Sequence, residues 1–98
     1  MDLPVSGWKN KRGTGERTCR CGSWAQHWVN FSGQSWPATC SVAGCSQRPT
    51  LGAHVINSAV SGEFIVPMCD ACNKRVGEFS LKGGIGLASA NVQETCGW

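Results

Sequence analysis

The chain contains no apolar run close to the roughly 20 residues that a membrane-spanning helix needs, so we expect no such helix. Its first residues, MDLPVSGWKNKRGTGER, carry charges with no apolar core behind them and do not resemble a secretory signal peptide. Tyrosine is absent, and no internal repeat is visible. These absences argue against a membrane protein, a secreted protein and a repeat array, and they favour a cytoplasmic location.

A length of 98 residues corresponds to one small domain. A chain of this size buries roughly two-thirds of the surface that it exposes when unfolded, so its core is thin. The 13 glycines indicate many turns and few long helices. We therefore expect a staple, such as a bound metal ion, to contribute much of the stability.

Seven cysteines are the most informative part of the composition. Their odd number and their CxC and CxxC spacings suit metal ligands better than long-range disulfides. Cys40 and Cys45 form one close pair, Cys69 and Cys72 form another, and 23 residues separate the two pairs. Two such pairs can bring four thiolates onto one tetrahedral Zn²⁺, so we predict a structural zinc site there, with four buried thiols as the alternative.

A short helix is predicted to follow the CxC motif. Ser23 is a suitable N-cap, and Trp24, Trp28 and Phe31 recur at the spacing of one helical face. We expect these aromatic side chains to face the core, with His27 beside them. An alternating strand is the competing interpretation of the same residues.

The cysteine pairs lie among further predicted elements. Gly44 would relieve backbone strain in a tight turn between Cys40 and Cys45. Pro67 is expected to end the second strand of a hairpin with a turn-rich connection. The two strands of that hairpin, a helix and a last short strand are expected at residues 51–56, 64–66, 70–79 and 85–89.

A turn with two cysteines, a hairpin, and a helix with two more cysteines make the treble-clef layout. The stretch from Cys40 to about Phe79 resembles the zinc-containing HNH endonuclease superfamily, through the segments GAHV, IVPMC and CDACNKR. The resemblance implies a small α+β domain stabilised by zinc, with a ββα-metal core. It covers roughly 40 residues of the chain.

The same resemblance implies a role for His54, which stands where the family has its general base. Other positions depart from the family pattern. Ala53 replaces the usual Asp, Phe64 stands near the place of the middle Asn, and Asn73 replaces the helix His. A missing carboxylate removes a ligand of the catalytic metal, so we expect a non-catalytic module, with a metal-dependent nuclease using His54 as the alternative.

Three cysteines remain outside the first site. Cys19, Cys21 and Cys96 could form a second zinc site with His27, which would tie both flanks of the chain to its body. His54 is an alternative fourth ligand. Buried thiols, a redox pair, or a redox or zinc sensor are the other interpretations. These segments also resemble small bacterial proteins of unassigned function that share CxCGSWxxHW, GAHV and an IVP-type CxxCN segment.

The sequence divides into a mobile basic arm at residues 1–18, which Trp8 could anchor, and a single zinc-binding domain at residues 19–98. The formal charge of +3 falls to +1 with one four-thiolate zinc site and to zero with a second site of three thiolates. We expect a macromolecular partner, with nucleic acid favoured over protein and exposed tryptophan available for base stacking. The candidate basic contacts are Lys9, Lys11, Arg12, Lys74 and Arg75.

Overall fold

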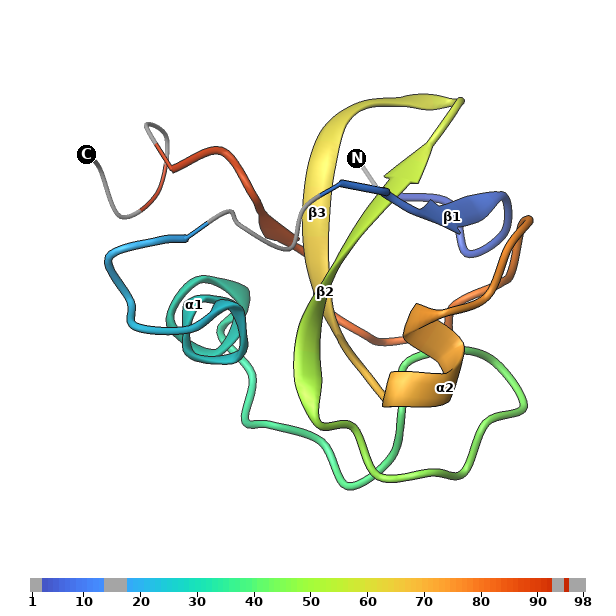
Figure 1. Cartoon of the computed structure of the whole chain (residues 1–98), viewed down its shortest axis with the longest axis horizontal. Helices are drawn as coiled ribbons and strands as arrows, with labels where there is room; N and C mark the ends of the chain where they lie inside the picture. The colour runs from blue at the N-terminus through green and yellow to red at the C-terminus, as the bar shows by residue number, and fades with distance from the viewer. Residues whose placement is uncertain (1–2, 14–17, 93–94, 96–98) are drawn as a thin grey trace.

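The computed structural model describes residues 3–13, 18–92 and 95, and it is built on an antiparallel four-stranded sheet (Figure 1). The strands lie in chain order, and two helices accompany them. The elements are β1 (Trp8–Asn10), α1 (Trp24–Ser32), β2 (Leu51–Asn57), β3 (Val60–Met68), α2 (Asp70–Asn73) and β4 (Ala88–Ser89). The predicted small α+β class is confirmed. Within the described part of the chain, neither helix has the length and apolar character needed to cross a membrane.

β2 and β3 form the predicted hairpin, but both strands are longer than the sequence indicated. Only Ser58 and Ala59 separate them, so the expected turn-rich connection is wrong. The side chain of Asn57 accepts a 2.9 Å hydrogen bond from the Ala59 backbone N–H, and such a bond closes a tight turn. Pairing therefore begins at once, between Asn57 and Val60.

Pro67 lies inside β3 opposite Gly52, although the sequence predicted that it ends the strand. Its carbonyl oxygen accepts a 3.0 Å hydrogen bond from the Ser41 backbone N–H, so this edge of Pro67 points away from β2. β4 pairs with β3 at residues 64–65, so the missing N–H of Pro67 costs the sheet no bond. β4 itself is a shorter form of the strand predicted near residues 85–89.

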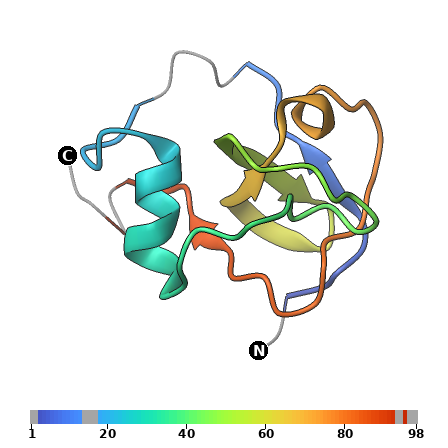
Figure 2. The ribbon, with the colours of Figure 1, turned by 90° about the horizontal axis from the view of Figure 1, so that it is seen from below.

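The two faces of the sheet carry different layers. Ala53 and Val55 point into a cluster that contains the cysteines of α2, whereas His54 between them packs against Trp24 of α1. Figures 1 and 2 show α1 on one side of the sheet and α2 on the other. Gly52 permits the close approach of α1, because a Cβ atom there would lie 2.5 Å from the Trp24 carbonyl carbon.

β1 lies inside the segment that the sequence assigned to a mobile arm. Trp8 is fully buried, and its ring meets Phe64 edge-to-face at a centroid distance of 5.8 Å. Its indole N–H donates a 2.7 Å hydrogen bond to the Pro4 carbonyl oxygen. Residues 8–10 therefore belong to the folded domain, and Trp8 is a core residue as well as an anchor.

α1 begins as predicted, because the Ser23 hydroxyl accepts a 3.0 Å hydrogen bond from the Gln26 backbone N–H. The face that it buries differs in part from the prediction. Trp28 is buried against Ile65 and Ala88, but Phe31 is 41% exposed. His27 is fully buried instead, and its ring is hydrogen-bonded to the Ser89 carbonyl oxygen.

α2 is much shorter than the predicted helix at residues 70–79. The side-chain amide of Asn10 donates to the backbone carbonyls of Cys72 and Arg75, and Gly77 adopts φ of 99°, a left-handed conformation that a continuing helix does not allow. Val76 is consequently 80% exposed. Phe79 leaves the helix and exchanges backbone hydrogen bonds with Trp8 of β1.

Candidate metal centres and a basic groove

The structure brings the two cysteine pairs together. The sulfur atoms of Cys40, Cys45, Cys69 and Cys72, the four-cysteine cluster, all lie within 4.8 Å of one another. The Cys45 and Cys69 sulfurs are 3.8 Å apart. A tetrahedral ion with metal–sulfur bonds of about 2.3 Å separates its sulfurs by about 3.8 Å, whereas a disulfide requires about 2.05 Å. The four-cysteine cluster can therefore hold a metal ion, and none of the six described cysteines forms a disulfide.

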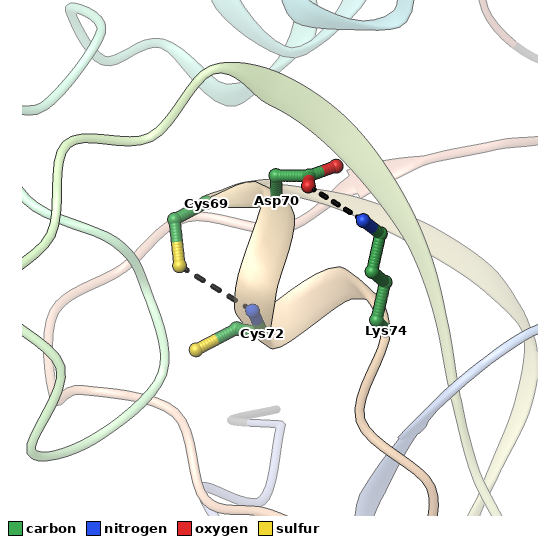
Figure 3. A network of polar contacts seen from close by, with 4 residues as sticks. All are labelled: Cys69, Asp70, Cys72 and Lys74. Atoms are coloured by element: carbon green, nitrogen blue, oxygen red, sulfur yellow. Dashed lines mark hydrogen bonds and ion pairs between the residues drawn. The ribbon is translucent and has the colours of Figure 1, made fainter.

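Local backbone geometry positions these sulfurs. Gly44 adopts φ of 83° in the turn that the Cys45 N–H closes onto the Val42 carbonyl oxygen, as its predicted role requires. Cys69 caps the N-terminus of α2, and its sulfur accepts a 3.4 Å hydrogen bond from the Cys72 backbone N–H. Figure 3 shows the sulfurs of Cys69 and Cys72 on the same side of α2.

The thiols of the four-cysteine cluster differ in how easily they ionise. Burial raises the pKa of Cys40, and burial with contacts to Cys69 and Cys45 raises the pKa of Cys72 to about 12. Burial also acts on Cys69, but hydrogen bonds from the Cys72 backbone N–H and the neighbouring thiols outweigh it and lower its pKa. Among these three thiols, Cys69 ionises most easily, and four thiolates in one cluster need a cation among them.

Lys82 supports the four-cysteine cluster from outside it. Its ammonium group donates hydrogen bonds to the Cys45 carbonyl oxygen at 2.6 Å and to the Thr39 hydroxyl at 3.0 Å. A positive charge at this position partly offsets the net negative charge of four thiolates around a divalent ion. Lys82 is not predictable as a site residue, because no local motif links it to a cysteine 37 residues away.

A second group of metal-binding side chains lies at the start of α1. The ligand atoms of Cys19, Cys21 and His27, the Cys–Cys–His cluster, also lie within 4.8 Å of one another and can hold a metal ion. Cys21 and His27 approach most closely through Sγ and Nδ1, at 3.7 Å. Cys96, the fourth ligand suggested by the sequence, lies outside the described residues.

His54 belongs to neither cluster and packs against an aromatic ring. It is 5% exposed, and its ring meets Trp24 edge-to-face at a centroid distance of 4.4 Å. The adjacent Ala53 points to the opposite face of the sheet, and Phe64 packs against Trp8. No carboxylate of a described residue joins His54 in a group of potential metal ligands.

Positive side chains gather where the end of β1 meets α2. A groove of about 340 Å³ lies there, and we call it the basic groove. Its lining residues are Asn10, Lys11, Arg12, Gly13, Asn73, Lys74 and Arg75. Lys9 does not line it, although the sequence grouped that residue with the others. The Asp70 carboxylate pairs with Lys74 at 2.9 Å, on an exposed surface of α2 (Figure 3).

The expected exposed tryptophan is not found among the described tryptophans. Trp8 and Trp28 are fully buried, and Trp24 and Trp36 are half-buried. Trp98 lies outside the described residues.

Comparison of the chain with protein-family models, with curated proteins and with solved structures finds no match.

Proposed function

We propose that this chain is a zinc-stapled module of treble-clef, HNH-like outline that binds the phosphate backbone of nucleic acid without cleaving it. The observation that carries the proposal is the basic groove, in which Lys11 and Arg12 meet Lys74 and Arg75. Contacts of Lys and Arg with phosphates supply most of the affinity that does not depend on sequence. The small net charge of the whole chain makes this local concentration of positive charge the main source of attraction.

Zinc is the metal that the four-cysteine cluster fits best. An all-thiolate, tetrahedral ligand set without an open position is typical of structural zinc. A bound ion there joins the turn at residues 40–45 to the N-terminus of α2. This link fixes the position of Lys74 and Arg75, which follow directly on α2.

Asn10 connects the other half of the basic groove to this zinc site. Its amide holds the end of β1 against α2 through the Cys72 and Arg75 carbonyl oxygens. Lys11 follows directly, and its backbone N–H donates a 2.9 Å hydrogen bond to the His54 carbonyl oxygen. The cations are thus held on ordered backbone, which reduces the entropy that binding costs.

The exposed ion pair of Lys74 with Asp70 leaves Lys74 available to a phosphate. Exposed pairs of this kind contribute about 0–1 kcal/mol, and a phosphate contact replaces one easily. Arg75 lies 5.9 Å from the ring centroid of Phe79, which orients its guanidinium beside the groove.

The surroundings of His54 support the non-catalytic interpretation. A general base must reach the water that it activates, and the His54 side chain is almost fully buried between β2 and α1. Cys72 of α2 packs on the other sheet face, with Ala53 and Val55. The helix residue Asn73 therefore belongs to a layer that His54 does not face.

A binding assay tests this proposal. Fluorescence anisotropy with labelled single- and double-stranded DNA and RNA should give affinities that fall steeply with salt. The double variant Lys11→Gln/Arg12→Gln should weaken binding to every sequence and lower the salt slope by about 2. The matched control, Lys9→Gln/Arg48→Gln, removes the same charge outside the groove. Equal effects of the two double variants would contradict the proposal.

A further inference from the structure

We propose that Cys19, Cys21 and His27 bind a second zinc ion, through two thiolates and the Nδ1 atom of the imidazole. This inference goes beyond nucleic-acid binding and does not depend on it. Three observations support it: the tautomer of the His27 imidazole, the distances among the three ligand atoms, and the backbone turn that carries the two cysteines.

The hydrogen bond of His27 fixes which ring nitrogen can bind a metal. Nε2 lies 2.7 Å from the backbone carbonyl oxygen of Ser89, in β4. A carbonyl oxygen only accepts, so Nε2 carries the proton and donates it. In a neutral imidazole the lone pair then belongs to Nδ1, the atom that faces Cys21. Metal-binding histidines almost always donate their second ring N–H in this way.

The distances within the Cys–Cys–His cluster suit one tetrahedral ion. Zinc–sulfur and zinc–nitrogen bonds of about 2.3 and 2.0 Å at a tetrahedral angle place the two ligand atoms about 3.5 Å apart. The Cys21 Sγ and His27 Nδ1 atoms lie 3.7 Å apart, and Cys19 Sγ lies within 4.8 Å of both. His54, the other imidazole considered from the sequence, is not in this group.

The backbone presents the two sulfurs to the same helix turn. The Gly22 N–H donates a 3.4 Å hydrogen bond to the Cys19 carbonyl oxygen, and Gly22 adopts φ of 96°. This glycine lets the chain reverse after Cys21 and enter α1 at Ser23. His27 follows one turn later, so the CxC spacing and the helix start act together.

A pair of neutral thiols is the competing state of this cluster. In that state Cys21 donates its S–H to His27 Nδ1, and Cys19 donates to the Ser23 carbonyl oxygen at 3.5 Å. Both states keep His27 in the same tautomer, so the tautomer alone does not separate them. A count of bound ions and a direct test of the metal–nitrogen bond distinguish the metal-bound state from the thiol state.

Native mass spectrometry of the full chain should detect two zinc ions in the wild type. The variant Cys19→Ser/Cys21→Ser should retain one, because the four-cysteine cluster is untouched. His54→Ala should keep two, since its ring is not a ligand. A wild type with one zinc, or a double variant with two, would overturn the proposal.

A second measurement avoids substitutions, and so stands even if a variant fails to fold. With ¹¹³Cd in place of zinc and ¹⁵N in the histidine rings, NMR should show a scalar coupling between cadmium and His27 Nδ1. His54 should show none. Full cadmium loading without coupling at His27 would refute the assignment, whatever the state of the four-cysteine cluster.

Discussion

The side-chain amide of Asn10 donates a 2.9 Å hydrogen bond to the backbone carbonyl oxygen of Cys72, 62 residues further along the chain. This contact joins the N-terminal strand to α2, which contains the proposed zinc ligand Cys72 and is capped by another, Cys69. The Cys72 carbonyl oxygen also accepts a 3.1 Å hydrogen bond from the Arg75 backbone N–H, so Asn10 adds a second donor at the end of that helix.

Replacing Asn10 by alanine should lower the free energy of unfolding of the zinc-loaded protein by about 0.5–1.5 kcal/mol, because two side-chain hydrogen bonds are lost, while the Cys72 carbonyl keeps the Arg75 N–H as a donor. The same change should weaken nucleic-acid binding, because the two halves of the basic groove separate. Chemical denaturation at fixed zinc concentration measures the first effect. Asn30→Ala, on the exposed face of α1, is the control and should change stability by less than about 0.5 kcal/mol.

Removing zinc from the four-cysteine cluster should destabilise the domain and loosen the packing of α2 against β2 and β3, whose pairing does not use the cysteines. Cys69→Ser and Cys72→Ser should each release this zinc and weaken the near-UV circular dichroism of the buried Trp8 environment. A chelator should have the same effect on the wild type, and added zinc should reverse it. Retention of the native spectrum after complete zinc removal would count against a structural role.

Gly52→Ala should destabilise the protein by about 1–3 kcal/mol, because its Cβ would lie 2.5 Å from the Trp24 carbonyl carbon and push α1 away from the sheet. Gly83→Ala is the matched control. A Cβ at Gly83 meets no atom within 4 Å, and this glycine does not need a positive φ. Similar melting temperatures for the two variants would argue against the close approach of α1.

Zinc affinity at the four-cysteine cluster should rise with pH, because the ion must displace thiol protons. In the metal-free protein, the pKa of Cys72 is raised from 9.0 to about 12. The folded chain therefore holds this proton more tightly than the unfolded chain does. The resulting stability is present below pH 9.0 and is lost as pH rises towards 12. Metal competition and metal-free denaturation, each measured across pH, should give opposite slopes.

The wild-type protein should not nick plasmid DNA with Mg²⁺, Mn²⁺ or Ni²⁺. The reasons are the burial of His54 against Trp24 and the replacement of the family's Asp by Ala53, which points to the opposite face of the sheet. Gel electrophoresis of supercoiled plasmid is a direct readout. Cleavage by the wild type that disappears in His54→Ala would restore the nuclease interpretation.

The features that the sequence predicted correctly are short-range. Cysteine spacing, the Ser23 cap and the glycine of the turn act within a few residues, so their signals are visible in the chain itself. The bonds of Asn10 to the end of α2 were not predicted, because they join residues far apart in the sequence. The support from Lys82 is equally remote. The segment around Trp8 looked like an arm, because a strand of three residues has too little periodicity to recognise.

The register of the β2–β3 hairpin has a consequence for metal uptake. Leu51, six residues after Cys45, pairs with Met68, the residue before Cys69, so pairing of the strands already brings the two cysteine pairs closer together. A 24-residue separation between Cys45 and Cys69 would otherwise carry a loop-closure entropy that the ion has to overcome. Pairing of β2 with β3 closes most of this loop before the ion binds, so less entropy is lost on binding. An ion bound there would meet ligand segments that the strand register has already brought together, and a slip of the strands by one residue would displace one segment against the other.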